Sequence, residues 1–233
     1  MIRLTSFVHL RDDAAPSARD DLVALGTRLA DEVDALSVQA APTGARVHRA
    51  GQLMLLAAFG DEQQLDAARR HRYVTDVLAP AIAAVATNVE TVRYTQGGVD
   101  LRQPGLAAGV QRTLLVRVLP DAPAVEVQRF LAALGAMPHY IDTIRNSSVS
   151  RVDEVWGTTA TAGLPWTHVW EQEYETLDGL LGPYMQHAYH WAWVDRWFDP
   201  QQPIHIVDTT LVHAMCDLGS SILSLEPRVV TAS

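Results

Sequence analysis

The chain has 233 residues, a net charge of −9 and 48% hydrophobic residues, enough to build one large or two small domains. All 18 basic residues are arginine, which excludes a lysine Schiff base, a lysine-anchored pyridoxal cofactor and a Walker-type phosphate loop. The single cysteine, Cys216, excludes an internal disulfide and a multi-cysteine zinc site. The acidic balance argues against a nucleic-acid partner, and no apolar run reaches membrane-spanning length. We therefore expect a cytoplasmic protein without a membrane partner.

The first half of the chain alternates between strand and helix patterns. Strands are predicted over residues 2–10, 46–50, 53–59 and 89–95, and helices over residues 17–36 and 61–87. Pro42 and Gly44 break the chain after the first helix, and Gly51 separates the two middle strands. Pro80 is expected to kink or restart the second helix.

The second half repeats this order. Strands are predicted over residues 111–119, 144–155, 166–174 and 204–213, and helices over residues 124–134 and 175–198, with a break at Gly182-Pro183. Each half therefore has the order βαββαβ of a ferredoxin-like unit. The alternative is two unrelated α+β lobes.

The fold class that follows is α+β, with two tandem ferredoxin-like repeats in one chain. A four-stranded sheet covered on one side leaves its other face bare, so we expect the two bare faces to pack as an intramolecular dimeric α/β barrel. The predicted domains are a repeat over residues 1–96, a linker over 97–109, a second repeat over 110–213 and an irregular C-terminal tail over 214–233.

Residues suited to chemistry are concentrated in the second half, which holds all six tryptophans and six of the nine histidines. On a helix, Tyr184, His187 and His190 would share one face, where a phenol can hold an oxyanion and a histidine can move a proton near neutral pH. Strand alternation would place Trp166, His168 and Trp170 on one face. The candidate binding residues are therefore the tryptophans at these and neighbouring positions, namely Trp166, Trp170, Trp191 and Trp193.

The pattern Thr167-His168-Val169, followed by Tyr184-x-x-His187-x-x-His190, resembles the stress-responsive dimeric α/β-barrel (Dabb) family. The usual His-Pro-x-His of that family is here His187-Ala188-Tyr189-His190, without the proline. Within the family, the second half is similar to plant polyketide cyclases of the olivetolic acid cyclase type. The resemblance implies that His190 is the base, that Tyr184 assists it and that His168 contacts the substrate, with His187 as the first motif histidine. A further family histidine falls near Thr113 and is not carried over.

The first half matches this family only in outline. His71 stands where the second half has His187, but Ala68 replaces Tyr184 and Val74 replaces His190. We therefore expect a degenerate first repeat and a working second one.

Three functions are open, and the first is a polyketide-type cyclase acting on an aromatic or poly-β-ketone precursor. The second is an oxygenase of polyphenols, free of resident cofactors or using reduced flavin as a diffusible co-substrate. The third is a non-catalytic barrel that binds a small ligand. No resident cofactor and no metal is expected, although His168, His187 and His190 could together form a three-histidine metal site. A homodimer of the fused barrel is possible.

Overall fold

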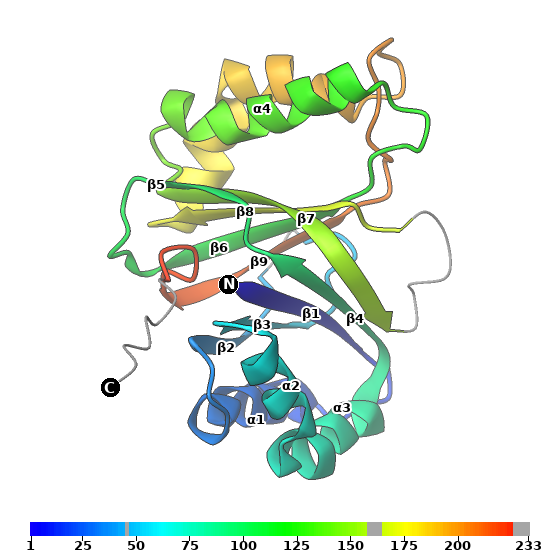
Figure 1. Ribbon diagram of the computed structural model, residues 1–233, viewed down its shortest axis with the longest axis vertical. Helices are drawn as coiled ribbons and strands as arrows, with labels where there is room; N and C mark the ends of the chain where they lie inside the picture. Colours follow the sequence, from blue (N-terminus) through cyan, green and yellow to red (C-terminus); the bar gives the residue numbers. More distant parts are fainter. Residues whose placement is uncertain (45–46, 158–164, 226–233) are drawn as a thin grey trace.

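The computed structural model describes residues 1–44, 47–157 and 165–225. Two helical layers enclose strands that run through the middle of the molecule (Figure 1). The first half contains β1 (Ile2–Leu10), α1 (Ala18–Glu32), β2 (Ser37–Pro42), β3 (Leu53–Phe59), α2 (Glu62–Arg70), the π-helix η1 (Tyr73–Leu78), α3 (Ala79–Val85) and β4 (Ala86–Thr95). The second half contains β6 (Ala107–Val116), α4 (Ala124–Tyr140), β7 (Asn146–Gly157), β8 (His168–Tyr174), α5 (Leu177–Gly179), the π-helices η2 (Leu180–Tyr184) and η3 (Tyr189–Val194), the 3₁₀-helix η4 (Asp195–Trp197) and β9 (Val212–Ser220).

The strand order confirms the tandem ferredoxin-like repeat. The strands run β2-β3-β1-β4 in the first half and β7-β8-β6-β9 in the second, the same order in both. One seam joins the halves through antiparallel pairing of β4 with β7. The opposite seam is held by two isolated bridges, Thr43 to Cys216 and His48 to His213. The sheet is therefore nearly closed into a barrel within one chain.

The barrel interior and the two helix-covered faces form separate cores. Phe7, Leu115 and Val169 belong to an interior cluster to which both halves of the chain contribute side chains. The interior also holds a buried ion pair, in which Arg3 Nη2 lies 3.0 Å from Glu171 Oε1. A second cluster fills the space between α4, the segment after β8 and the outer face of β6 and β8. The two cores put alternate side chains of each strand in different environments.

Two strands lie elsewhere than predicted. The second strand is β2 at Ser37–Pro42 rather than at residues 46–50, of which 46 is outside the described residues. Pro42 fits there because β2 lies at the sheet edge, where the missing N–H is tolerated. Gly51 has φ +65, and a Cβ on it would lie 2.2 Å from the Val8 carbonyl oxygen, so this turn requires glycine.

The last strand is also displaced, from the predicted residues 204–213 to β9 at Val212–Ser220. Asp208 Oδ1 accepts the Thr210 backbone N–H at 2.6 Å, and this local turn interrupts the predicted strand before β9 begins. Residues 214–220, predicted to be tail, therefore complete the sheet. The expected linker likewise contains a short strand, β5 (Gly98–Leu101), which pairs with β7.

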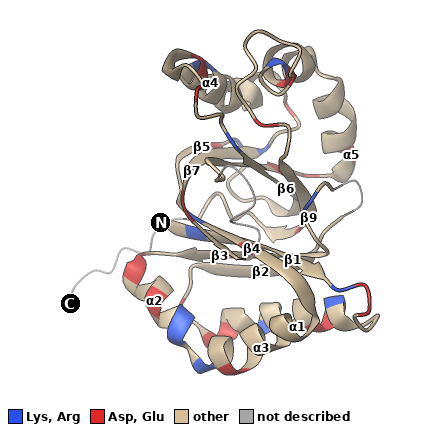
Figure 2. Ribbon diagram, turned by 90° about the vertical axis from the view of Figure 1, so that its right-hand side faces the viewer, with Lys and Arg blue, Asp and Glu red and all other residues tan. Residues whose placement is uncertain are grey.

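Charged residues are frequent along α1 and α2, the outer helices of the first repeat, whereas α3 has none (Figure 2). In the predicted helix over residues 61–87, the expected break is confirmed, because Pro80 stands in the first turn of α3. Among the described residues, no helix is both long and apolar enough to cross a membrane.

Candidate functional site

Tyr184 and His190 lie together beneath the helical layer of the second repeat. Tyr184 ends η2 and His190 lies in η3, and their ring centroids are 4.5 Å apart. Tyr184 is 0% exposed and His190 is 7% exposed. Both residues stand on π-helical turns, which are frequent at functional sites. The predicted pairing on one helical face is therefore present, although short π-helical pieces replace a continuous helix.

Three strands of the sheet supply polar side chains to this pair. Arg112 of β6 donates from Nε to His213 Nε2 of β9 at 3.0 Å, and from Nη1 to Gln172 Oε1 of β8 at 2.6 Å. The Tyr174 hydroxyl donates to the same Gln172 oxygen at 2.8 Å. The Arg112 guanidinium also lies 5.0 Å from the centroid of the Tyr184 ring. A cation is thus held next to the phenol and the imidazole.

The sequence patterns do not predict a role for Arg112 or His213. Arg112 stands in β6 on the same face as Leu114 and Val116, which belong to the helix-side core. A lone arginine within that apolar alternation is the signal that could have found it. His213 is the last residue of the strand predicted over residues 204–213, and only the register of β9 against β6 brings it next to Arg112.

Burial and the Arg112 charge keep the two histidines of the site neutral. Desolvation, followed by the positive charge of Arg112, lowers the pKa of His190 to about 4. The same causes, with smaller contributions from His48 and His190, lower the pKa of His213 to about 3. Desolvation raises the pKa of Tyr184 to about 12 against the opposing effect of Arg112, so the phenol stays protonated. The site therefore combines neutral bases, a phenol donor and a permanent cation.

Several polar atoms of this site have no hydrogen-bond partner within the described residues. They are Tyr184 Oη, His190 Nδ1, Gln172 Nε2 and the indole Nε1 of Trp170. Buried polar atoms of native proteins are nearly always paired, with protein, water or ligand. Asp195 lies on the other side of the imidazole, with Oδ1 3.5 Å from His190 Nε2. The unpaired atoms make this cluster, hereafter the Arg112 cluster (Arg112, Gln172, Tyr184, His190 and His213), the candidate functional site.

His187 has a local structural contact instead. Its Nδ1 accepts the backbone N–H of Tyr189 at 3.1 Å, and the Tyr189 hydroxyl donates to the Ala133 carbonyl of α4 at 3.3 Å. The first repeat contains the same arrangement. There Nδ1 of His71 accepts the Tyr73 N–H at 3.3 Å, and the Tyr73 hydroxyl donates to a carbonyl of α1 at 2.9 Å. The predicted equivalence of His71 and His187 is thus reproduced in their hydrogen bonds.

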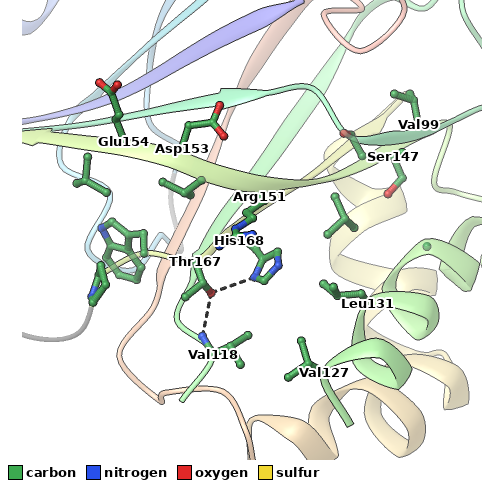
Figure 3. Close-up of a pocket in the computed structure, with 18 of the residues that line it drawn as sticks. Val99, Val118, Val127, Leu131, Ser147, Arg151, Asp153, Glu154, Thr167 and His168 are labelled. Atoms are coloured by element: carbon green, nitrogen blue, oxygen red, sulfur yellow. Dashed lines mark hydrogen bonds between the residues drawn. The ribbon is translucent and has the colours of Figure 1, made fainter. Parts of the chain in front are cut away.

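His168 lies apart from Tyr184 and His190, on the wall of an open cleft of about 1360 Å³ between β5, β7 and α4 (Figure 3). Neither Tyr184 nor His190 lines this cleft. His168 and Gln172 are four residues apart on β8, a distance of about 13 Å at strand spacing. The structure therefore does not bring His168 to the Arg112 cluster.

The histidine of the cleft is oriented by Thr167. Thr167 Oγ1 donates to the Val116 carbonyl at 3.1 Å and accepts the Val118 N–H at 2.9 Å. Its 3.0 Å contact with His168 Nδ1 is therefore best made by an Nδ1–H donor, which leaves Nε2 as the basic nitrogen. Burial, aided by the charge of Arg151, lowers the pKa of His168. The walls of the cleft are largely apolar, with Val118, Val127 and Leu131 on one side (Figure 3).

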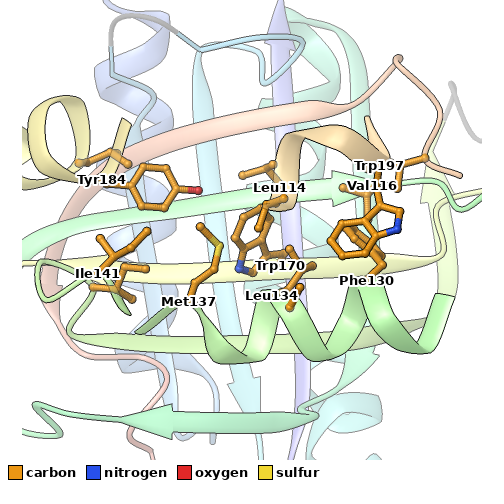
Figure 4. Close-up of a cluster of buried hydrophobic side chains, with 14 of the residues drawn as sticks. Leu114, Val116, Phe130, Leu134, Met137, Ile141, Trp170, Tyr184 and Trp197 are labelled. Atoms are coloured by element: carbon orange, nitrogen blue, oxygen red, sulfur yellow. The ribbon is translucent and has the colours of Figure 1, made fainter. Parts of the chain in front are cut away.

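The four candidate tryptophans occupy three environments. Trp170 is 1% exposed in the helix-side core, beside Met137 and Leu134 (Figure 4). Trp166 belongs to the barrel-side cluster, donates to Glu90 and lines the cleft, so the predicted common face with Trp170 is wrong. Its position precedes β8, where strand alternation does not yet apply. Trp191 and Trp193 are 58% and 53% exposed on the outer helical surface.

Metal-ligating side chains do not gather in the described part of the chain. No three of its His, Cys, Asp and Glu side chains are placed to hold a metal ion. The alternative metal site of His168, His187 and His190 is therefore not formed.

Residues 110–211 match the family described as the stress responsive A/B barrel domain. The comparison with curated proteins finds no match. The chain is similar in structure to an anthrone oxidase-like protein, at 12% identity and a TM-score of 0.64, over 99% of this chain and 96% of that one.

Two further solved structures also match over nearly the full length. A protein described as a monooxygenase from Lactobacillus acidophilus NCFM has 9% identity and a TM-score of 0.58, over 94% of this chain and 97% of that chain. One described as a monooxygenase from Fusobacterium nucleatum has 8% identity and a TM-score of 0.60, over 94% and 95%. At these identities the similarity establishes the shared fold of the whole chain.

Proposed function

We propose that the chain, whose residues 110–211 match the stress responsive A/B barrel domain, is a small-molecule enzyme whose Arg112 cluster deprotonates an acidic aromatic or poly-β-ketone precursor. The observation that carries this proposal is the pair of unpartnered buried atoms, Tyr184 Oη and His190 Nδ1, on rings 4.5 Å apart. A substrate oxygen and its neighbouring C–H would satisfy both atoms at once.

His190 is the base in this proposal. With a pKa of about 4 the imidazole is neutral near physiological pH, and in the tautomer whose Nε2–H faces Asp195 Oδ1 the lone pair is on Nδ1. The substrate proton moves from carbon to Nδ1, and the electron pair left behind becomes an enolate or phenolate. Asp195, 3.5 Å from Nε2, stabilises the imidazolium that results. This arrangement compensates for the weak basicity that burial imposes on the resting imidazole.

Tyr184 and Arg112 stabilise the anion. The Tyr184 phenol, whose pKa is raised to about 12, keeps its proton and donates to the developing oxyanion. Arg112 uses two of its five N–H groups on His213 and Gln172, so further donors remain for the substrate. A positive charge in a buried site contributes more to such stabilisation than one in water.

The anion has two chemical fates, and cyclisation is the first. In a poly-β-ketone the carbanion attacks a carbonyl of the same chain, a carbon–carbon bond forms, and the carbonyl oxygen takes the proton back from His190. Loss of water then gives the aromatic ring. The residues that fold the chain into one reactive geometry would supply much of the rate gain.

Oxygenation is the second candidate, and it is favoured by the descriptions of the three full-length structural relatives as anthrone oxidase-like and monooxygenase proteins. An anthrone-like phenolate would react with O₂ at carbon to form a hydroperoxide. Loss of water converts the original CH₂ into a carbonyl, so one oxygen atom enters the product and the other leaves as water. Reduced flavin, as a diffusible co-substrate, would serve substrates that need two further electrons.

The test uses anthrones and synthetic poly-β-ketones, with oxygen uptake and product mass followed together. We expect His190→Ala to lower turnover by about 10² to 10⁴-fold with folding intact. His168→Ala, in the separate cleft, is the matched comparison. If His168→Ala abolishes turnover and His190→Ala leaves it unchanged, the chemistry belongs to the cleft and the assignment to the Arg112 cluster fails. Incorporation of ¹⁸O from O₂ into the product separates oxygenation from cyclisation.

A further inference from the structure

A second concave site lies on the outside of the second repeat, away from the Arg112 cluster. It is a shallow groove of about 540 Å³ between α4 and the segment formed by η3, η4 and Ile204. Small-molecule sites commonly have volumes of about 300–1,000 Å³. Its aromatic residues are Tyr189, Trp193 and Trp197, and its charged ones are Glu126, Arg129 and Arg196.

The aromatic side of the groove is partly open to solvent. Trp193 is 53% exposed, and its ring is nearly parallel to that of Tyr189, at 18° with centroids 6.4 Å apart. Tyr189 in turn stacks on Tyr140 at 4.2 Å. Aromatic rings held in parallel form a rigid platform for another flat ring.

The charge of the groove is unbalanced. Arg129 Nη1 lies 2.5 Å from Glu126 Oε1, so these two charges neutralise each other. Arg196 makes no ion pair with any described residue, and its guanidinium carbon lies 4.8 Å from the ring centroid of Trp193 and 4.3 Å from that of Trp197. The groove therefore has one uncompensated positive charge, in a chain with a net charge of −9.

Two donors of the groove-lining residues also have no partner. Arg196 Nε and Trp197 Nε1 are buried and make no hydrogen bond within the described part of the chain. The two indole contacts hold the guanidinium in place, and the edge of a guanidinium can pair with a carboxylate through two parallel N–H donors.

We propose that this groove is a binding site for a flat aromatic carboxylate, whose ring lies against Trp193 and whose carboxylate pairs with Arg196. The site is distinct from the Arg112 cluster and does not depend on the activity proposed for it. Fused bicyclic aromatic acids match the groove in size and charge.

The probe is 2-naphthoate, and its neutral control is 2-naphthamide. We expect 2-naphthoate to quench tryptophan fluorescence and to bind by calorimetry, and the amide to bind about tenfold more weakly or not at all. Arg196→Gln should weaken naphthoate binding by about ten- to a hundredfold, as expected for loss of charge-assisted hydrogen bonds. Trp193→Ala should weaken it and remove most of the quenching.

Two control variants locate the bound naphthoate. Trp191→Ala removes an exposed tryptophan outside the groove and should leave binding unchanged. His190→Gln, in the Arg112 cluster, should also leave naphthoate binding unchanged. Unaltered melting temperatures of Arg196→Gln and Trp193→Ala would exclude misfolding as the cause of their loss of binding. Equal binding of acid and amide, or an Arg196→Gln variant that binds like the wild type, would overturn the proposal. So would loss of binding only in His190→Gln, or a ligand-free dimer that Trp193→Ala dissociates, since the groove would then be covered by a second copy.

Discussion

Acid sensitivity of folding is the most direct consequence of the two neutral histidines in the Arg112 cluster. The folded-state pKa values of His190 and His213 are about 4 and about 3, whereas an unfolded histidine has a pKa of about 6.5. Below pH ~6.5 the unfolded chain therefore binds two protons that the folded protein does not. The stability that depends on these two neutral histidines is fully present above this pH and is lost as the pH falls toward their folded-state pKa values.

The magnitude follows from the linkage relation. Each such histidine lowers the free energy of unfolding by about 1.4 kcal/mol per pH unit of acidification. Each therefore accounts for a loss of about 2 kcal/mol between about pH 6.5 and about pH 5. Together the two histidines account for a loss of about 4 kcal/mol over this pH range, which is a large part of the stability of an ordinary domain. Asp195 and Glu171, whose pKa values burial raises, act in the opposite direction at lower pH.

A difference measurement isolates the histidine contribution from these carboxyl groups. Urea unfolding is followed at constant ionic strength across this pH range for the wild type and for the double variant His190→Gln/His213→Gln. We expect the wild type to lose about 4 kcal/mol more than the double variant on acidification. His139→Gln, at an exposed position of α4, is the control and should follow the wild type. Parallel pH profiles for the wild type and the double variant would refute the argument.

Three further outcomes test other parts of the structure. Arg3→Met should cost about 3–5 kcal/mol in urea unfolding because it leaves Glu171 buried without its 3.0 Å ion-pair partner, and adding Glu171→Leu should restore most of this. His71→Ala and His187→Ala should each cost about 1 kcal/mol, since each removes one hydrogen bond to a backbone N–H, and neither should change ligand binding. Tyr184→Phe should keep or raise the melting temperature, because the hydroxyl has no partner, while lowering turnover of the proposed reaction; a clear loss of stability would mean that the hydroxyl is bonded in the folded protein.

Much of the fold follows from patterns that are local in the chain. Helical spacing of apolar residues and strand alternation predict the repeated βαββαβ order, since each repeat builds its own helix-side core. The errors concern strands whose position depends on distant partners. In β9 the residues facing the barrel, Val212, Ala214, Cys216 and Leu218, alternate as in an ordinary strand. This pattern follows a turn at Asp208, and the barrel seam that selects it joins residues more than 150 positions apart.

The same distinction between local and distant contacts applies to the candidate site. Tyr184 and His190 lie six residues apart, and their proximity was predictable from the spacing of one helical segment. Arg112 and His213 reach them from strands far away in the sequence. The lone arginine in an apolar alternation marks Arg112 as unusual, but no local pattern predicts which residues it contacts. The residue type of His168 and the family resemblance predict that it lies with Tyr184 and His190. Its position at the start of β8 instead places it in the cleft.

Comparison of the two repeats separates the residues that build the fold from those that remain for chemistry. His71 and His187 make the same hydrogen bond to the backbone N–H two residues later, each at the start of a π-helical turn. A contact that occurs in both halves is explained by the needs of the fold, because only one half contains the Arg112 cluster. His190 has no such counterpart, since Val74 occupies its place in the first repeat. A neutral histidine beside an unpaired phenol and an arginine costs stability that the apolar Val74 does not, and its presence in one repeat alone supports the proposal that His190 acts on a ligand.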